Sequence, residues 1–228
     1  MTTLPQGRPP FRADHIGSLL RPQVLRQAFR DYAAKRIDDA AFAKIQDDCI
    51  RDVVKMQEDV GLKVVTDGEF RRGSYWGRFV ERIDGFAIKP AVFKFRDDAG
   101  HQVDFTAPHA QGKLKRNKPL ALDEYEFLKG ITGATAKITL PAPSTMHFYR
   151  ATDFADRSAY SDTASFFADL NRIFREEIAD LTKAGCKYIQ LDEVAIALLC
   201  DPAIRKLVEA CGMKPDDLVD LYIDAINE

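Results

Sequence analysis

The chain has 228 residues, and its 33 Lys and Arg against 35 Asp and Glu give a net charge of −2. This balance excludes a nonspecific nucleic-acid binder, which needs a basic excess to contact phosphates. Hydrophobic residues make up 46%, including 15 Phe and 7 Tyr, so wholesale disorder is excluded too. No apolar run approaches the roughly 18 residues of a membrane span, so we expect no membrane partner.

The first residues hold no apolar stretch of the kind found in a signal peptide, and residues 1–13 are expected to be irregular because prolines block a helix there. The four cysteines lack the close spacing of a metal or disulfide motif: Cys49, Cys186, Cys200 and Cys211. Reduced thiols of this kind predict a cytoplasmic protein. At this length we expect a single domain over residues 1–228.

The first half of the chain begins with a short apolar segment at 14–19 that suits a strand running into a loop, followed by a helix at 22–34 and a clearer helix at 39–60. In the clearer helix, apolar side chains recur at spacings of three and four, which predicts one buried face formed by Phe42, Ile45, Cys49, Val53, Met56 and Val60. Residues 63–69 follow, and they are predicted to form a β-branched strand that ends in an acidic loop containing a glycine.

Residues 84–116 alternate between apolar and polar side chains around a turn at 97–100, which predicts a β-hairpin. The elements expected after it are a helix at 119–128, a strand at 136–140, a helix at 161–184 capped by Ser161 or Asp162, a strand at 187–191, and helices at 201–210 and 215–227. This alternation favours parallel βα units with right-handed crossovers.

Polar side chains follow each of the four predicted strands at its carboxyl end. They are His15 and Ser18, Asp67 and Glu69, Ser144 and Thr145, and Asp192 and Glu193. Because these ends build the active site of parallel α/β folds, we predict a ligand site there. Taken singly, each pair also fits a simpler role, such as a tight turn at Asp67-Gly68 or a helix cap at Asp192-Glu193.

Other polar and aromatic residues are ambiguous from sequence alone. Arg71-Arg72 and Lys113-Leu-Lys-Arg116 are basic enough to contact an anionic ligand, but a solvated face is the favoured interpretation. His109 falls in the hairpin and is expected to be solvated. Trp76 lies in a loop beside glycines, where it fits either stacking on a flat ligand or packing under the loop.

Four motifs occur in order along the chain, namely Asp14-His-Ile-Gly-Ser18, Val65-Thr-Asp-Gly-Glu-Phe-Arg71, Leu140-Pro-Ala-Pro-Ser-Thr145 and Tyr188-Ile-Gln-Leu-Asp-Glu193. Together they resemble the cobalamin-independent methionine synthase family, especially its short single-barrel members, which are similar to the C-terminal catalytic half. The resemblance covers almost the whole chain. It implies an α/β fold, a (β/α)₈ TIM barrel of the uroporphyrinogen decarboxylase/methionine synthase type, with only about the first four βα units present here.

The resemblance also implies a homocysteine S-methyltransferase, which uses a donor such as 5-methyltetrahydrofolate. Ile16, Gly17 and Ser18 match the segment that holds the backbone end of homocysteine, with Ser18 donating to its carboxylate. Glu69 and Asp192 match the two carboxylates that bind its ammonium group, since two acids can pair with one buried cation.

Ser144 and Thr145 match the loop beside the methyl donor, and we place Trp76 on the same side. Tyr149 stands where the family has a tryptophan that stacks on the pterin, and Leu198 stands where it has an acid. These differences leave the donor open between a folate, a corrinoid and another methyl carrier.

Zinc activates the homocysteine thiol in this family, and its ligands are a His-x-Cys pair, a Glu and a later Cys. They follow the fifth and later strands, so we assign no zinc ligand within residues 1–228 and expect the ligands beyond Glu228. No catalytic residue is assigned.

Two alternatives stay open beside a methyltransferase seen as its N-terminal portion. One is an inactive half-barrel that binds a complementing half-barrel or forms a homo-oligomer, because open sheet edges associate. The other is a different barrel enzyme that uses paired carboxylates, such as a decarboxylase. Length motivates the first alternative, since a complete barrel takes about 250 residues.

Overall fold

The computed structural model describes residues 15–96, 99 and 101–228. The chain forms two compact units. The first consists of Met1–Tyr75, Ala121–Thr139 and Leu181–Gln190, and the second of Trp76–Leu120, Leu140–Asp180 and Leu191–Glu228. The predicted arm at 1–13 and, apart from Ala99, the predicted turn at 97–100 lie outside the described residues. The assignment of one domain to the whole chain remains a prediction.

The central sheet contains three strands in the order β1 (Val64–Val65), β6 (Thr135–Pro141) and β7 (Tyr188–Asp192). β1 pairs with β6 in parallel. Over its described residues 15–19, the segment predicted as the first strand forms no strand, and only Ser18 pairs, in a parallel bridge with Gly68 that places the segment beside the chain that continues from β1. The four predicted strand segments therefore follow one another in chain order, as neighbouring strands do in a barrel.

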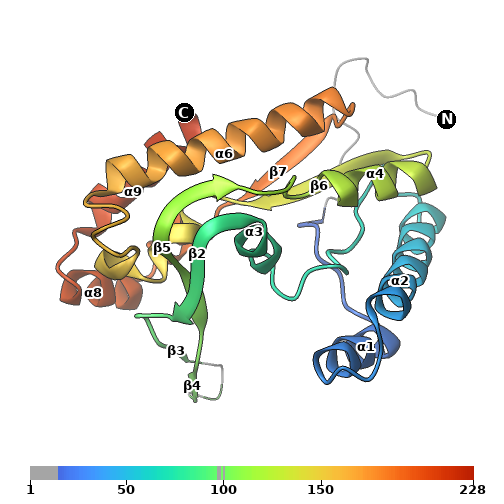
Figure 1. Cartoon of the computed structure of the whole chain (residues 1–228), viewed down its shortest axis with the longest axis horizontal. Coiled ribbons are helices and arrows are strands. Elements are labelled where there is room, and N and C mark those ends of the chain that lie inside the picture. The colour runs from blue at the N-terminus through green and yellow to red at the C-terminus, as the bar shows by residue number, and fades with distance from the viewer. Residues whose placement is uncertain (1–14, 97–98, 100) are drawn as a thin grey trace. The chain divides into compact units, whose positions relative to one another are not determined.

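The helices of the first unit are α1 (Gln23–Ala33), α2 (Asp39–Asp59) and α4 (Leu122–Ile131), and they confirm the three helices predicted there. α1 and α2 lie side by side (Figure 1). Phe42 of α2 joins them, because its ring stacks on Tyr32 at 4.5 Å and meets the edge of Phe29 at 5.0 Å. Asp38 caps α2 by accepting a hydrogen bond from the Ala41 N–H at 2.8 Å.

The buried face of α2 differs from the predicted one. Met56 and Val60 are 46% and 69% exposed, whereas Gln46 and Gln57 are buried. The Gln57 amide exchanges two hydrogen bonds with the Thr66 peptide, donating to its C=O at 2.8 Å and accepting from its N–H at 3.0 Å. The polar side turns inward because the chain after β1 needs these partners.

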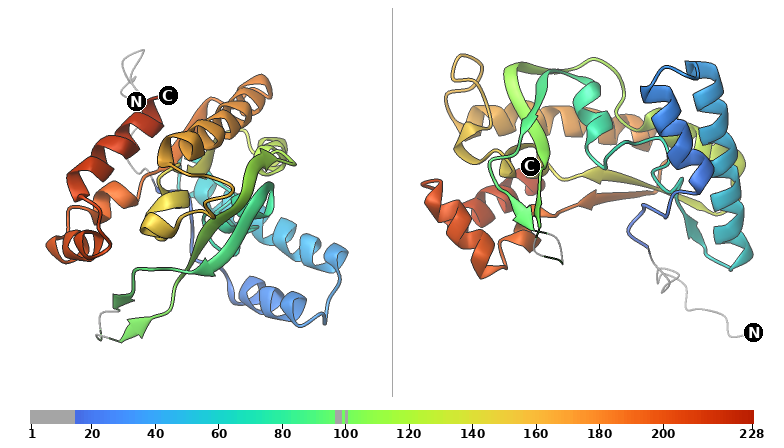
Figure 2. Two further views of the ribbon diagram at one scale, coloured as in Figure 1. Left: turned by 60° about the vertical axis from the view of Figure 1, so that its left-hand side comes forward. Right: turned by 90° about the horizontal axis from the view of Figure 1, so that it is seen from below.

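The predicted hairpin is confirmed as β2 (Ile83–Pro90) paired antiparallel with β5 (Thr106–Arg116), with β3 (Phe95–Arg96) and β4 (Gln102–Val103) at its far end (Figure 1 and Figure 2). The register shifts at Gly85, where φ is +95° and an added Cβ would lie 2.6 Å from the Lys113 carbonyl oxygen. Such a bulge requires glycine.

The expectation that His109 is solvated is wrong. This β5 side chain is buried, with Nδ1 2.9 Å from the Asp153 carbonyl oxygen and Nε2 2.8 Å from Asp156 Oδ1. Two hydrogen bonds to a segment more than forty residues away hold the imidazole inside, and they fix the hairpin to that segment.

The remaining helices are α3 (Gly77–Glu81), α5 (Thr145–Phe148), the 3₁₀ turn Ala151–Asp153, α6 (Thr163–Lys183), α7 (Ala195–Leu198), α8 (Pro202–Ala210) and α9 (Pro215–Asn227). Asp162 proves to be the cap of α6, since its Oδ1 accepts from the Ser165 N–H at 2.7 Å. Phe166 of α6 lies at the centre of an aromatic core, 5.0 Å from Phe154 and 5.5 Å from Tyr160. Within the described ranges, no helix has the length and apolar character needed to cross a membrane.

Replacing Gln57 with alanine tests the amide bridge to Thr66. We expect Gln57→Ala to lower the free energy of unfolding by about 1–3 kcal/mol, because the buried Thr66 peptide loses both partners. Gln27→Ala, at an exposed position of α1, is the matched control and should change little. Chemical denaturation measures both, and equal effects would show that the bridge is not a stabilising contact.

Candidate functional site

The loop after β1 carries Glu69 in an unusual backbone conformation. Its φ is +59°, a left-handed value that few residues other than glycine adopt, and it follows Gly68 at φ +68°. Asp67 supports the turn, because its Oδ1 accepts from the Glu69 N–H at 2.8 Å. Strain of this kind persists where the surroundings enforce it, and it often marks a functional site.

Glu69 belongs to a buried set of polar groups that we call the Arg72 cluster, consisting of Asp67, Glu69, Arg72, Glu124 and Thr139. Arg72 donates from Nε and Nη2 to Glu124 Oε2 at 3.0 and 2.7 Å. It also donates to Thr139 Oγ1 and to the Thr139 carbonyl oxygen at 3.0 and 2.8 Å. Glu69 Oε1 accepts from Thr139 Oγ1 at 2.7 Å and lies 3.7 Å from Arg72 Nη1.

The interpretation of Arg71-Arg72 as a solvated pair is therefore wrong for Arg72, which is 1% exposed. A guanidinium can be buried when carboxylates and carbonyls take up its N–H groups, as Glu124 and Thr139 do here. Arg71 lies outside the cluster, where it pairs with Asp47 and lies over the Phe127 ring.

The charges of the cluster perturb one another strongly. Burial raises the pKa of Asp67 to about 6, repulsion by Glu124 and Glu69 adds to the shift, and Arg72 opposes it. Burial works against the charge of Arg72, but the neighbouring carboxylates, Glu124 above all, raise its pKa above the usual value. Within the described residues, Asp67 Oδ2 is buried without a hydrogen-bond partner. Three carboxylates around one guanidinium favour the approach of a further cation.

The first motif lies directly against this cluster. Gly17 has φ +120°, and an added Cβ would lie 2.3 Å from Thr139 Cγ2 and 3.3 Å from Glu69 Oε1. The segment is held by Thr66 Oγ1, which donates to the Gly17 carbonyl at 2.6 Å, and by Gln190 Nε2, which donates to the Ile16 carbonyl at 2.7 Å. The first unit thus brings the Ile16–Ser18 segment and Glu69 together.

The exposure of this segment leaves it open to a ligand. Ile16 is 73% exposed and Ser18 is also exposed, whereas Gly17 between them is buried. Lys137 Nζ donates to the His15 carbonyl oxygen and, at 2.9 Å, to Gln190 Oε1. The backbone is therefore fixed while the side chains on either side of Gly17 remain accessible.

The second unit holds the other predicted site residues. The Asp192 carbonyl oxygen accepts from the Ala142 N–H at 3.1 Å, which ties the end of β7 to the loop after β6. Ser144 Oγ donates to Glu193 Oε2 at 2.5 Å. Glu193 Oε1 accepts from the Ile196 N–H at 2.8 Å, so this residue of the pair takes the helix-capping role that the sequence left open.

The predicted methyl-donor residues of this unit are all buried. Thr145, Trp76 and Tyr149 are between 1% and 5% exposed. The Tyr149 ring packs at 4.8 Å from Phe105 and 5.4 Å from Phe148. Packing within the unit accounts for both aromatic residues, and their contact with a donor remains a prediction.

A buried contact between His147 and Tyr222 was not predicted from the sequence. His147 Nδ1 lies 2.8 Å from the Tyr222 hydroxyl, and the two residues are 75 positions apart. Burial lowers the pKa of His147 to about 4, so the imidazole is neutral at physiological pH. Burial, reinforced by Glu193, raises the pKa of Tyr222 well above its usual value. No sequence signal pairs them, because local patterns carry no information on residues 75 positions apart.

Zinc is the metal that the family resemblance implies, and the residues at hand do not fit it. Over residues 15–96, 99 and 101–228, no three His, Cys, Asp or Glu side chains gather in a way that could hold a metal ion. Burial raises the pKa of the Cys49 and Cys186 thiols, which disfavours the thiolate that zinc requires. We therefore derive no chemical step through zinc.

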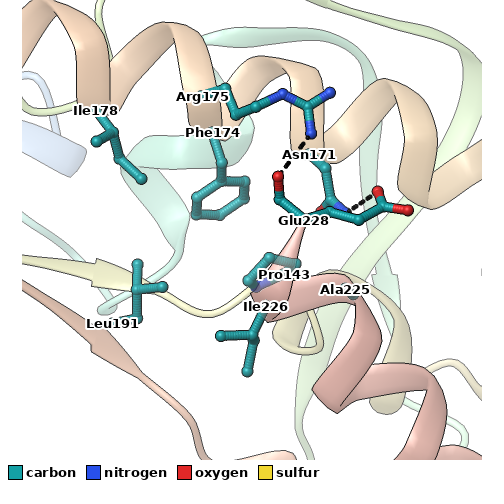
Figure 3. A pocket seen from close by; sticks show the side chains of 9 residues that line it. All are labelled: Pro143, Asn171, Phe174, Arg175, Ile178, Leu191, Ala225, Ile226 and Glu228. Carbon is teal, nitrogen blue, oxygen red and sulfur yellow. Dashed lines mark hydrogen bonds between the residues drawn. The ribbon is translucent and has the colours of Figure 1, made fainter.

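A small hollow in the second unit is apolar and narrow (Figure 3). Its volume is about 50 Å³, and Phe174, Ile178, Leu191 and Ile226 are among its lining residues. Arg175 and Asn171 both donate to Glu228 beside it, at 3.2 and 2.8 Å. Ligand pockets hold several hundred cubic ångströms, so this hollow is too small for an amino acid.

Comparison with known proteins identifies one family. A family model described as the catalytic domain of cobalamin-independent synthase matches residues 11–206. The uncharacterized protein YxjH of Bacillus subtilis is 35% identical over 229 residues, which cover 98% of this chain and 58% of that protein. A methionine synthase of Sulfolobus acidocaldarius is 31% identical over 182 residues, covering 79% of this chain and 51% of that one.

Two solved structures are similar to this one. A putative vitamin-B12 independent methionine synthase from Listeria monocytogenes gives a TM-score of 0.72 at 27% identity, covering 96% of this chain and 60% of that chain. A B12-independent methionine synthase from Shewanella sp. W3-18-1, solved in complex with selenomethionine, gives 0.58 at 26% identity, covering 77% and 49%. The chain thus spans between about half and 60% of the length of these relatives.

Replacing Asp67 with asparagine tests the electrostatics of the Arg72 cluster. The pKa of Asp67 rises from 3.8 to about 6 in the fold, so the native state binds more protons between these values and loses stability as pH rises through them. The loss amounts to about 3 kcal/mol. We expect Asp67→Asn to remove it and so flatten the stability profile between pH 4 and 7.

Denaturant titrations across this pH range measure the effect. Asp38→Asn is the matched control, since this exposed aspartate also accepts a backbone N–H at 2.8 Å. A profile in which both variants keep the wild-type slope would show that Asp67 ionises normally.

Proposed function

Since the chain belongs to the family of cobalamin-independent methionine synthase catalytic domains, we propose that it serves a homocysteine S-methyltransferase and binds the amino-acid substrate. The proposed fold of the whole enzyme is a (β/α)₈ barrel, to which this chain contributes the first four strands. The family match over residues 11–206 supports the enzyme class. The Shewanella neighbour supports an amino-acid ligand, because selenomethionine has the shape of the product.

One observation carries the proposal, namely the close approach of the first motif to the Glu69 carboxylate. An added Cβ on Gly17 would lie 3.3 Å from Glu69 Oε1, so the Gly17 backbone and the Glu69 carboxylate lie close enough to contact the same ligand. We propose that Glu69 accepts from the substrate ammonium group and that Ser18 donates to its carboxylate. The surplus of carboxylates in the Arg72 cluster favours a cation there, and the held backbone of Ile16–Ser18 reduces the ordering cost of binding.

Asp192 is proposed as the second carboxylate that binds the ammonium group, as the family resemblance implies. Two acids stabilise a desolvated ammonium better than one. Ser144, Thr145, Tyr149 and Trp76 are proposed to lie on the side of the methyl donor, whether 5-methyltetrahydrofolate or another carrier.

Substrate binding is the role proposed for this chain, and activation of the homocysteine thiol is not assigned to its described residues. Deprotonation of the thiol is the chemistry that zinc supplies in the family, and the described residues do not fit a zinc centre. The zinc ligands are proposed to lie beyond Glu228. A complementing half-barrel or a second copy of the chain is the proposed partner, and the cytoplasm is the proposed location.

Calorimetric titration of L-homocysteine into the chain tests the proposal. We expect Glu69→Gln and Asp192→Ala each to weaken binding by about 2–5 kcal/mol, because a desolvated ammonium loses a charged partner. Glu126→Gln, at an exposed position of α4, is the control and should bind normally. 4-Mercaptobutanoate, which lacks the amino group, should bind poorly to the wild type. Equal affinity for both ligands would contradict the assignment and favour another carboxylate-based barrel chemistry.

Two glycine substitutions separate backbone strain from steric exclusion. Gly17 and Gly61 both have a positive φ, but an added Cβ clashes only at Gly17 and meets nothing within 4 Å at Gly61. We expect Gly17→Ala to abolish homocysteine binding and to destabilise the fold more than Gly61→Ala, which should bind normally. Titration together with thermal unfolding measures both, and indistinguishable variants would refute the close approach.

A further inference from the structure

The first unit contains a pocket that the proposed substrate site does not use. Its volume is about 340 Å³, and it is lined by Arg21, Arg26, Phe29, Arg30, Arg72 and Gly73. We call it the arginine pocket. Three lining residues belong to α1. Arg21 directly precedes Pro22, the N-cap of α1, and Arg72 and Gly73 belong to the loop that follows Glu69. The volume lies within the range of small-molecule sites.

The charge of the pocket is one-sided. Four of its six lining residues are arginines, and none is acidic. Residues 15–36 carry five Lys or Arg against one Asp, in a chain whose net charge is −2. That aspartate, Asp31, accepts from Arg36 and Gln27, and these bonds lower its pKa. The Asp31 carboxylate is therefore hydrogen-bonded to two side chains that do not line the pocket, although the charge of Arg30 in the lining also acts on it.

The arrangement of α1 places two of these positive charges one helical turn apart. Arg26 and Arg30 are separated by four residues, and like charges at this spacing repel each other and destabilise a helix. Arg30 donates from Nε and Nη2 to the Gln27 side-chain oxygen at 3.2 and 2.8 Å, so these two bonds go to a neutral partner. A bound anion would remove the repulsion.

Arg21 is held in place before any ligand binds. Its Nη2 donates to the Arg72 carbonyl oxygen at 2.6 Å and to the Glu69 carbonyl oxygen at 3.4 Å. Its guanidinium lies 5.6 Å from the centre of the Phe29 ring. Its Nε is buried and has no hydrogen-bond partner among the residues that the structure describes. A buried donor without a partner is costly, and an oxyanion would satisfy it.

Arg72 contributes rigidity more than charge. Its guanidinium is paired with Glu124 and Thr139 in the Arg72 cluster, so the positive charge offered to a ligand comes from Arg21, Arg26 and Arg30. The pocket wall and the loop that carries Glu69 share this fixed side chain. Fixed donors lower the ordering cost of binding.

We propose that the arginine pocket binds a ligand with several anionic oxygens, either a phosphate compound or a polycarboxylate. Guanidinium groups recognise both through paired N–H···O bonds, and the Phe29 ring offers an apolar wall beside them. The site is separate from the amino-acid site proposed above, and its test does not depend on that function.

Calorimetric titration of pyrophosphate and of citrate into the chain at 0.15 M salt tests the proposal. We expect at least one of them to bind, and the tighter one identifies the phosphate or the carboxylate class. Arg26→Gln and Arg30→Gln should each weaken binding at least tenfold. Both residues are exposed on α1, so these substitutions leave the core intact.

Lys44→Gln is the matched control, because it removes one exposed positive charge from α2 outside the pocket. Equal weakening in all three variants would indicate unspecific attraction and overturn the proposal, as would the absence of binding by both anions. Homocysteine affinity should be unchanged in Arg26→Gln, and this separates failure of the pocket from failure of the proposed function.

Discussion

The buried guanidinium of Arg72 is the group on which the architecture of the first unit depends. It ties the loop after β1 to α4 through Glu124 and to β6 through Thr139. Burying this charge is tolerable only because its neighbours satisfy its N–H groups, and removing one of them would leave an ion stranded. The same contacts orient Glu69 through Thr139, so stability and the candidate binding site share one network.

The regular elements could be predicted from local patterns. Spacings of three and four predicted α2, alternation predicted the hairpin of β2 and β5, and Asp162 was among the predicted caps of α6. The inward positions of Gln57, Arg72 and His109 could not be predicted. A polar side chain is buried only when its partners exist, and Arg72 finds Glu124 52 residues away. Composition within a window carries no information on such pairs.

In the candidate site, too, local motifs could be predicted from the sequence, whereas contacts between distant residues could not. The order of motifs placed the Ile16–Ser18 segment and Glu69 at the ends of neighbouring strands, and the structure shows that they meet at Gly17. The ionisation of Asp67 and the capping by Glu193 depend on distances that no motif encodes. The sequence gives no sign that Arg21 is anchored, because the carbonyl groups that accept from it belong to Glu69 and Arg72, about fifty residues further along the chain.

The backbone at Glu69 has a consequence for how this chain can vary. A φ of +59° suits glycine better than any other residue, so replacement by glycine would relieve strain at that position. Glycine would, however, remove a carboxylate that accepts a hydrogen bond from Thr139 at 2.7 Å and lies 3.7 Å from the buried Arg72 guanidinium. The position therefore joins a local backbone cost to a stabilising contact, and a substitution that relieves the first loses the second.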